Sequence, residues 1–373
     1  MEKTRKKIPD RIAVAAGLLL LLALGLAAIL APGGEFSEWE RRILADRPGT
    51  PDLEYWKTEK AVESFLKDHI PARRELVALD SSAEFLTGRG STLGAWYTSG
   101  ALVEPPVPVE TKALETKLRR IDKIAESAGV PWYLISPRSH GWLMRDRMTP
   151  VVAGAYDAEA EGYALLDASP NTVQMPEAFN ADPDTMYYRT DHHWTLQGAY
   201  QAYLALAAPL GYEPVPLEEF RRTEYTGFRG TTLSRSGLPA LWEDTIDCAE
   251  PESAVVMTAI DRGEEKVSDR LIFPEAAATW DGYAVYLDGN HGTLVIERES
   301  APEGTLIVYK DSMANSLLPL LSLHFRRIIA VDARYEDGIF SDALARSDDT
   351  KAILCVYSLE SLANDTEITR KAK

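Results

Sequence analysis

The apolar residues of this chain form three kinds of pattern, and each pattern predicts a different kind of element. The first is an unbroken run of twenty residues without a charge, IAVAAGLLLLLALGLAAILA, from Ile12 to Ala31. At about 1.5 Å rise per residue, a helix of this length extends for about 30 Å, the thickness of a bilayer core. The residues before it are rich in Lys and Arg, which favour the cytoplasmic side of a membrane. We therefore expect a cytoplasmic flank at 1–11 and a transmembrane anchor at 12–31, with the rest of the chain outside the cytoplasm.

A cleavable signal peptide is the alternative interpretation of this N-terminus. Signal peptides have a shorter apolar region that ends in a small-x-small cleavage site. Here the apolar run has the full length of a membrane span, and Pro32 directly after it is a poor residue to follow a cut. Both features favour an anchor that stays uncleaved.

In the second pattern, apolar residues recur with helical spacing. Residues 32–110 form a connector in which TEKAVESFLKDHIPARRELVAL predicts a helix interrupted at Pro71, followed by a proline-rich link. A well-marked helix begins at Lys112 and ends before Gly129, and another is predicted by TLQGAYQAYLALAAPLG, which Gly211 closes. The first of these two helices has one apolar face, made of Leu114, Leu118, Ile121, Ala125 and Ala128.

The third pattern consists of short apolar runs of strand length. VPWYLISP is one such run, and in the C-terminal third TLIVYK, RIIAVDA and AILCVYS alternate with the helical stretches SMANSLLPLLSLHF and GIFSDALARS. This β-α-β-α-β order predicts an α/β domain over 111–373, with a parallel sheet covered by helices on both faces. We also expect a strand at MYYRT and a hairpin at YAVYLDGNHGTLVIE, whereas 215–280 gives only weak signals.

Charge and cysteine content narrow the function only slightly. The formal net charge of −17 repels nucleic-acid phosphates, so a nucleic-acid partner is not expected. The only two cysteines, Cys248 and Cys355, are compatible with a disulfide outside the cytoplasm and equally with two buried thiols.

The candidate chemistry begins at the end of the run TLIVYK. Parallel α/β sheets bind ligands at the carboxyl ends of their strands, and Asp311 and Ser312 follow the strand end at Lys310. A serine that opens a helix is well placed to be a nucleophile, because helix-start amides stabilise an oxyanion. Serine is also a common helix cap, which is the alternative interpretation.

A serine nucleophile needs a base and a group that orients the base, and RTDHHWT offers both. On an extended segment, alternate residues face the same side. Asp191 and His193 are therefore expected to face the serine together, directly or after a turn, while His192 points the other way.

Three alternatives compete for the same motif. A metal site is disfavoured because adjacent histidines diverge on a strand and no H-x-x-x-H or cysteine cluster supports them, so we expect neither a metal nor a cofactor. The DHH phosphoesterases share three letters with the motif but need further aspartate motifs. The third alternative is structural: Asp191 and His193, followed by Trp194, would cap and pack the helix that begins near Thr195.

The motifs together resemble those of the DHHW proteins, a family of membrane-anchored bacterial proteins. The resemblance rests on YYRTDHHWTLQGAY, YLDGNHGTLVIE and LIVYKDSMANSLLPLL followed by VDARY, and on FSEWERRILADRP and FLKDHIPARREL near the N-terminus. It extends over most of 35–360 and is weakest between 215 and 280. It implies an SGNH hydrolase-like (flavodoxin-like) α/β fold after one N-terminal transmembrane helix.

The DHHW proteins in turn resemble the alginate O-acetyltransferase branch of that fold, whose catalytic Asp-x-His and Asp-Ser fall on Asp191, His193 and Ser312. One departure is Lys310, where that branch has a glycine before Asp-Ser; a glycine allows close backbone approach and a lysine does not. Asp288 and His291 form a rival Asp-x-x-His pair that precedes the serine instead of following it. We interpret Asn290 between them as a candidate oxyanion donor; an ordinary Asn in a glycine-flanked β-turn is the alternative interpretation.

These expectations combine into one hypothesis and one alternative. The hypothesis is an extracytoplasmic Ser-His-Asp O-acetyltransferase or esterase in the cell membrane, acting on a cell-surface or exported polysaccharide, with a membrane-bound acyl-donor protein as a candidate partner. In it, Ser312 is the nucleophile, His193 the base and Asp191 the orienting group. The alternative is a non-enzymatic envelope protein that binds glycans or assists assembly on the same fold.

Overall fold

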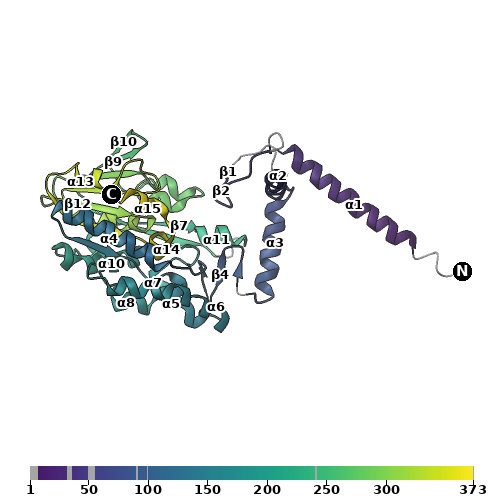
Figure 1. The fold of residues 1–373 in the computed structure, drawn as a ribbon, viewed down its shortest axis with the longest axis horizontal. Helices are drawn as coiled ribbons and strands as arrows, with labels where there is room; N and C mark the ends of the chain where they lie inside the picture. Colours follow the sequence, from purple (N-terminus) through teal and green to yellow (C-terminus); the bar gives the residue numbers. More distant parts are fainter. Residues whose placement is uncertain are drawn as a thin grey trace. The chain divides into compact units, whose positions relative to one another are not determined.

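The computed structural model describes residues 7–31, 36–48, 55–89, 91–98, 100–239 and 242–372, which divide into two compact units. The first unit holds the chain up to Arg89 together with Ser234–Pro239, and the second holds the rest (Figure 1). Each unit is described by itself below. The basic residues at 1–6 and Pro32, on which part of the N-terminal interpretation depends, lie outside the described residues.

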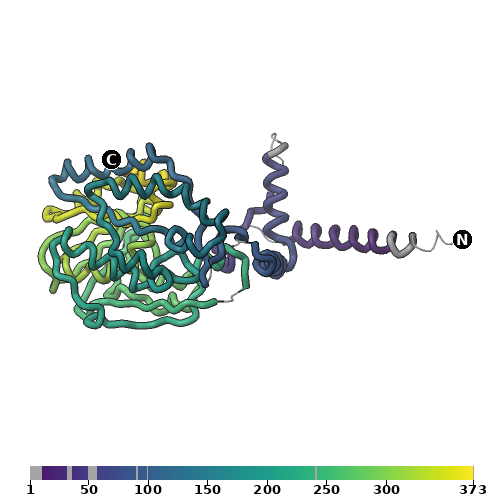
Figure 2. The backbone as a smooth tube through the Cα atoms, turned by 90° about the horizontal axis from the view of Figure 1, so that it is seen from below, coloured from purple at the N-terminus to yellow at the C-terminus, as the bar shows by residue number. Residues whose placement is uncertain are grey.

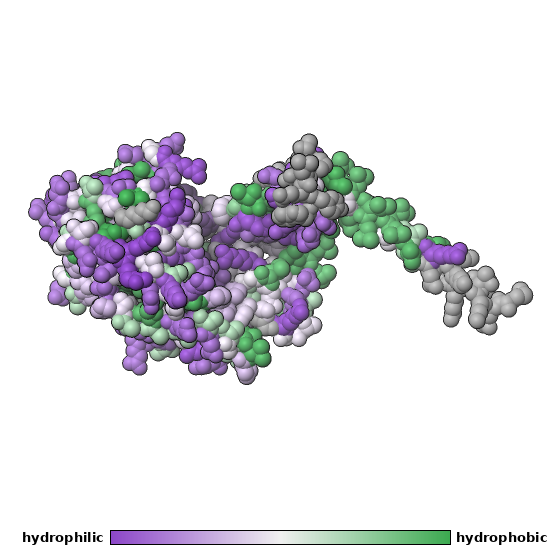
Figure 3. Space-filling view, in the orientation of Figure 1, coloured by the Kyte–Doolittle hydropathy of each residue, from purple (hydrophilic) through white to green (hydrophobic). Residues whose placement is uncertain are grey.

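The first unit is mainly helical. Helix α1 (Lys7–Leu30) includes Arg11–Leu30, which is long and apolar enough to cross a membrane, a test that a signal sequence also passes. From Arg11 onward most of its side chains are exposed, Ala28 being a buried exception, and the helix is predominantly hydrophobic (Figure 3). Helices α2 (Tyr55–His69) and α3 (Arg73–Leu86) confirm the helix predicted with a break at Pro71. Strands β1 (Phe36–Ser37) and β2 (Arg42–Ile43) form a small antiparallel pair.

The second unit is built on a seven-stranded mixed sheet with the order β10-β9-β11-β13-β12-β14-β6. Four of its strands are parallel, as predicted: β6 (Trp132–Ile135), β12 (Thr305–Lys310), β13 (Arg327–Val331) and β14 (Thr350–Val356). The other three add antiparallel pairing at one edge, which the sequence analysis did not predict: β9 (Val256–Asp261), β10 (Glu264–Ser268) and β11 (Thr293–Glu297).

Side chains along β12 alternate between two cores, one on each face of the sheet. Leu306 and Val308 pack into one core, while Ile307 and Tyr309 pack into the other. The first core is covered by α10 (Leu196–Leu210) and by the segment after β12. The second is covered by α4 (Thr111–Ala128), α7 (Asp157–Ala168), α13 (Phe340–Leu344) and α14 (Leu359–Asn364). Helix α4 and the C-terminal helices α14 and α15 (Thr366–Lys371) lie side by side (Figure 2). A sheet buried on both faces explains why its central strands are apolar without alternation.

The two well-marked helices end as predicted. Gly129 after α4 and Gly211 after α10 both adopt left-handed backbone angles, with φ of 67° and 74°. Glycine takes this conformation at little cost, because it has no Cβ. Cys248 and Cys355 are both buried and free, so they are two thiols and not a disulfide.

Two local predictions around the site are wrong. MYYRT does not form a strand: α9 (Pro183–Met186) ends there, and only an isolated bridge joins Tyr187 to Trp194. The predicted hairpin at 283–297 keeps only its second strand, β11, because residues Gly282–Val285 form a short 3₁₀ helix. The region 215–280, which gave weak signals, contains the antiparallel pair β7 (Arg221–Phe228) and β8 (Asp244–Glu250), and β9 and β10. Three further short strands, β3 (Ser91–Thr92), β4 (Ala95–Tyr97) and β5 (Leu102–Val103), form a sheet of their own.

Candidate active site

Ser312 lies directly past the carboxyl end of β12, at the start of a 3₁₀ helix (Ser312–Ser316). Asp311 fixes this junction. Its Oδ1 accepts a hydrogen bond from the backbone nitrogen of Met313 at 2.9 Å. Its Oδ2 accepts from the backbone nitrogen and the hydroxyl of Ser358, at 2.8 and 2.9 Å, just after the neighbouring strand β14. The carboxylate therefore joins two strand ends and holds the half-buried Ser312 at the edge of the sheet.

The motif that carries the two histidines is a tight turn and not the extended segment assumed from the sequence. The Oδ1 of Asp191 accepts a hydrogen bond from the backbone nitrogen of His193 at 2.9 Å, an Asx-type turn. The backbone nitrogen of Tyr188 donates to the carbonyl of His193 at 3.3 Å, which closes the loop. The extended segment, on which Asp191 and His193 were expected to face the serine together, is thus wrong, although the turn brings both residues to the site.

Asp191, His193 and Ser312 form one continuous hydrogen-bonded row. The Nδ1 of His193 lies 2.5 Å from the Oδ1 of Asp191, and its Nε2 lies 2.8 Å from the Oγ of Ser312. A carboxylate can only accept, so Nδ1 carries the proton, which leaves the Nε2 lone pair of a neutral ring to accept the serine proton. The row has the geometry of a nucleophile, a general base and an orienting group.

Burial sets the charge of the row. Asp191 is 1% exposed and His193 is 5% exposed. Burial lowers the pKa of His193 to about 4, so its imidazole is neutral at pH 7. Burial alone would raise the pKa of Asp191, but the two histidines and the backbone nitrogen of Thr231, which donates to its Oδ2 at 2.6 Å, hold that pKa well below its usual range.

Gly230 lets a second segment approach Asp191 closely. A Cβ at this position would lie 2.3 Å from the Cβ of Asp191 and 2.4 Å from the carbonyl of Thr190. The backbone nitrogen of Gly230 donates to the hydroxyl of Thr190 at 3.0 Å. Asp244 holds the same residue from the other side, since it accepts from the backbone nitrogen of Thr190 at 2.8 Å. Neither Gly230 nor Asp244 could be identified from the sequence, because they lie 40 and 54 residues from Thr190 along the chain.

Two aromatic residues, Tyr283 and Trp194, support the base. The ring of Tyr283 stacks on the ring of His193, with centroids 3.8 Å apart and planes at 8°. The hydroxyl of Tyr283 and the indole nitrogen of Trp194 both donate to the Oγ of Ser316, at 3.1 and 2.8 Å. Trp194, which is fully buried, therefore ties the histidine turn to the helix that Ser312 begins.

His192 does not point away from the site, which corrects our prediction. Its Nδ1 lies 3.5 Å from the Oδ1 of Asp191, and its ring centroid lies 3.9 Å from that of His193. Asp191, His192 and His193 therefore place three potential ligand atoms within 4.8 Å of one another, so these residue types could hold a metal ion. However, Asp191 and Ser312 already occupy both ring nitrogens of His193, and a metal that used this ring would replace one of those hydrogen bonds.

The rival pair, Asp288 and His291, is not a pair in this structure. The Nδ1 of His291 lies 2.6 Å from the Oδ2 of Asp261, and its Nε2 lies 3.0 Å from the carbonyl of Leu287. Asp288 instead pairs with Lys266 at 2.5 Å. His291 thus fixes the turn before it, where Leu287 and Asp288 have φ of 62° and 60°, a conformation that side chains rarely adopt.

Asn290 follows that strained turn and lies against the helix that Ser312 begins. Its Oδ1 accepts a hydrogen bond from the Nδ2 of Asn315 at 3.1 Å. Lys310, the departure from the expected glycine, is fully buried, and its Nζ donates to the Oδ1 of Asn315 at 2.8 Å. Its side chain is therefore directed into the protein toward Asn315 and does not project into solvent.

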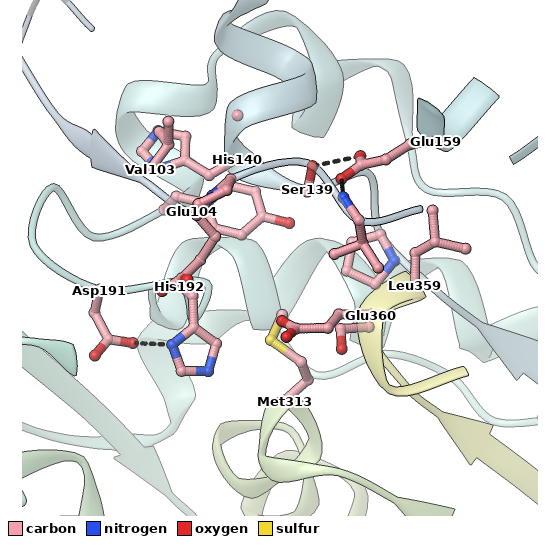
Figure 4. Close-up of a pocket in the computed structure, with 16 residues that line it drawn as sticks. Val103, Glu104, Ser139, His140, Glu159, Asp191, His192, Met313, Leu359 and Glu360 are labelled. Atoms are coloured by element: carbon pink, nitrogen blue, oxygen red, sulfur yellow. Dashed lines mark hydrogen bonds and ion pairs between the residues drawn. The ribbon is translucent and has the colours of Figure 1, made fainter. Parts of the chain in front are cut away.

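A cavity of about 60 Å³ opens beside the triad (Figure 4). Asp191, His192 and Met313 line it on the triad side. Three carboxylates, those of Glu104, Glu159 and Glu360, also line it, whereas no Lys or Arg is among its lining residues. His140, which is 4% exposed, has no hydrogen-bond partner for either ring nitrogen within the described part of the chain. The cavity is thus acidic, mostly apolar in its walls, and adjacent to the orienting end of the triad.

Comparisons with known proteins identify a family resemblance in this part of the chain. Residues 178–331, which hold the histidine turn, Asn290 and Ser312, match the family model described as DHHW protein, and this confirms the resemblance inferred from the motifs. No curated protein sequence matches the chain.

Solved structures with TM-scores of 0.60 and above share the fold. PatB1 of Bacillus cereus, determined with a sulfonyl adduct, is 21% identical with a TM-score of 0.61, over 73% of this chain and 96% of that one. A DHHW family protein from Eubacterium siraeum is 19% identical with a TM-score of 0.60, over 74% and 94% of the two chains. The O-acetyltransferase domain of Pseudomonas putida AlgJ is 14% identical with a TM-score of 0.43, over 75% and 98%.

Proposed function

We propose that this protein is a serine-dependent O-acyltransferase or esterase that acts on a cell-surface or exported polysaccharide outside the cytoplasm. One observation carries the proposal: the unbroken row Asp191–His193–Ser312, with contacts of 2.5 and 2.8 Å between neutral imidazole, carboxylate and hydroxyl. A serine that only caps a helix accepts one hydrogen bond from a backbone N–H of that helix, and it does not need a buried histidine aimed at its hydroxyl.

The row suits acyl transfer in two balanced steps. The Oγ of Ser312 attacks the carbonyl carbon of an acyl donor, and its proton passes to the Nε2 of His193, while Asp191 stabilises the imidazolium. The tetrahedral intermediate expels the donor alcohol or thiol, which takes the proton from His193. A sugar hydroxyl or water then gives its proton to the same nitrogen and attacks the acyl-serine, and Ser312 recovers its proton as it leaves.

Two donors are available for the oxyanion of that intermediate. The backbone nitrogen of Ser312 opens its helix, so it has no carbonyl of that helix to bond. The side-chain amide of Asn290 is turned by its contact with Asn315 so that Nδ2 faces away from that contact. Fixed donors of this kind lower the barrier because they stabilise charge that develops only in the transition state.

The acidic cavity indicates the kind of sugar that the site accepts. Glu104, Glu159 and Glu360 around it repel carboxylate-bearing sugars and favour neutral hydroxyls or an ammonium group. We therefore propose a neutral or amino-sugar polymer as acceptor instead of a polyuronate. A membrane location of the N-terminal helix α1 would keep the enzyme beside such a polymer and beside a membrane-bound acyl-donor protein.

The experiment is an acetyl-release assay on the purified protein with a chromogenic acetyl ester. Matched neutral, amino-sugar and uronate oligosaccharides serve as acceptors in parallel reactions. We expect ester cleavage that Ser312→Ala removes and a chelator leaves unchanged, with acetylated product from the neutral or amino sugars only. Stoichiometric zinc that is lost together with activity in His192→Ala would contradict the metal-free mechanism. A fully folded protein that is inactive with every ester would favour the glycan-binding alternative.

A further inference from the structure

We infer that Lys310 is a positioning residue that acts through Asn315 to turn the Asn290 amide toward the oxyanion. This inference rests on the proposed function, because it concerns a donor for the same acyl-transfer step. It starts from a buried basic side chain: Lys310 is completely buried and stands directly before Asp311 and Ser312.

Lys310 occupies a costly position. Its side chain is completely buried, and a buried ammonium is unfavourable unless it is paired and hydrogen-bonded. Its Nζ donates to the Oδ1 of Asn315 at 2.8 Å and lies 3.9 Å from the Oδ2 of Asp332. The two contacts explain how the charge is tolerated, and the first of them gives the lysine a definite orienting action.

The amide of an asparagine side chain has an oxygen that accepts hydrogen bonds and a nitrogen that donates them. A neighbouring group that can only donate, or only accept, therefore decides which way the amide is turned. At one end of Asn315 stands the Nζ of Lys310, a donor, and at the other stands the carbonyl of Gly289, which can only accept. Asn315 must therefore present Oδ1 to the lysine and Nδ2 to the glycine carbonyl, 3.3 Å away.

The orientation of the Asn315 amide in turn fixes that of the Asn290 amide. The Nδ2 of Asn315 also donates to the Oδ1 of Asn290 at 3.1 Å. Since the oxygen of Asn290 is held there, its Nδ2 is left to donate elsewhere, and it donates to no residue of the described ranges. The ammonium group of Lys310 thus sets, through Asn315, the orientation that Asn290 needs as an oxyanion donor.

The geometry of the 3₁₀ helix brings this relay to the serine. In such a helix, side chains three residues apart lie on the same face. Ser312 and Asn315 are three apart in the helix Ser312–Ser316, so Asn290, bound to Asn315, lies along the face that carries the serine. Lys310 itself is on the preceding strand, which fixes where its ammonium group can reach.

The test exchanges polarity without changing shape. Asn315→Asp keeps the size of the side chain but offers only acceptors, so it draws the Nδ2 of Asn290 toward itself and turns the oxygen of Asn290 toward the developing charge. We expect kcat for acetyl-ester cleavage to fall by about 10²–10³-fold, the usual loss for an oxyanion donor, with KM within about twofold. In Lys310→Met the Gly289 carbonyl still orients the Asn315 amide, although the ammonium group is lost. We therefore expect kcat to fall by only about 10-fold.

A double-mutant cycle separates positioning from general structural damage. Once Asn290→Ala has removed the donor, adding Asn315→Asp or Lys310→Met should cost less than about twofold more, because both act through Asn290. Full additivity in folded variants would overturn the relay, as would unchanged kcat in Asn315→Asp. If these two variants do not fold, Asn315→Ala and Lys310→Gln replace them in the same cycle.

The wild-type control keeps the two proposals distinct. Wild-type cleavage that needs Ser312 but is indifferent to Lys310 and Asn315 overturns the relay alone and leaves the proposed function in place. A wild type that cleaves no ester removes the proposed function, and the relay with it.

Discussion

The Nε2 of His193 lies 2.8 Å from the Oγ of Ser312, although 119 residues separate them along the chain. Two unrelated pieces of local structure produce this contact: an Asx-type turn that presents the imidazole, and a strand end that presents the hydroxyl. Among the residues that the structure describes, neither side chain has another hydrogen-bond partner, apart from Asp191 behind the imidazole.

Ser312→Ala and His193→Ala should each remove nearly all turnover while the protein keeps its fold. Because the members of such a row act as a unit, the double variant should be hardly worse than either single one. Asp191→Asn should lose about 10²–10⁴-fold, since it changes the tautomer of His193 and leaves the nucleophile in place. Steady-state kinetics with circular dichroism as the folding control measure this, and losses that simply multiply in the double variant would contradict a shared mechanism.

His291→Ala tests the rival base directly. Its ring links Asp261 to the strained turn before Asn290, so we expect a lower melting temperature and a moderate, about tenfold, loss of kcat. The acid limb of the rate–pH profile should not move, because His291 carries no proton in the reaction. Abolished turnover in His291→Ala together with normal turnover in His193→Ala would reverse the assignment.

The buried base gives a characteristic pH profile. Only the neutral imidazole accepts the serine proton, and burial lowers the pKa of His193 to about 4. Activity should therefore be flat from about pH 8 down to about pH 5 and should fall as the pH drops through about 4 and the ring gains a proton. Measurements of kcat/KM against pH check this. A midpoint near pH 6.5, the value of an exposed histidine, would mean that water reaches the ring.

Gly230→Ala should damage the site without touching a catalytic group. The new Cβ would lie 2.3 Å from the Cβ of Asp191, so the turn must shift, at a cost of about 1–3 kcal/mol in stability and a clear loss of kcat. Gly154→Ala is the matched control, because its Cβ meets nothing within 4 Å on helix α6 (Pro150–Ala155). That control should be neutral or slightly stabilising. Equal kcat in both variants would mean that Gly230 does not restrain Asp191.

The sequence predicted those parts of the molecule that depend on local pattern. The apolar runs predicted the parallel strands, and the strand end predicted the place of Ser312 at the edge of the sheet, because both follow from how a parallel sheet is built. Asp191 and His193 were found for an incorrect reason, since alternation on a strand was assumed where a turn is formed. The orientation of His192 was wrong for the same reason.

Other parts could not be predicted because they arise from contacts between distant segments. Gly230 has an ordinary loop sequence around it, and only the approach of Thr190 and Asp191 explains it. Tyr283 stacks on His193 from a segment that reads as a strand but forms a 3₁₀ helix. The antiparallel edge of the sheet is also set by tertiary pairing, because β10 is short and mostly polar and β9 lies in the region that gave only weak signals. The boundary of the catalytic domain at 111 and the uncleaved state of the anchor remain predictions.

Covalent labelling of Ser312 tests the central claim most directly. A sulfonyl fluoride transfers its sulfonyl group only to an activated nucleophile, and fluoride leaves with the serine proton. The protein should gain one sulfonyl group, which peptide mass spectrometry assigns to Ser312, and acetyl-ester cleavage should disappear in proportion. His193→Ala should react at least about 100-fold more slowly, and His291→Ala at nearly the normal rate. Labelling at another residue, or Ser312 labelling that is unaffected by His193→Ala, would contradict a catalytic row of Asp191, His193 and Ser312.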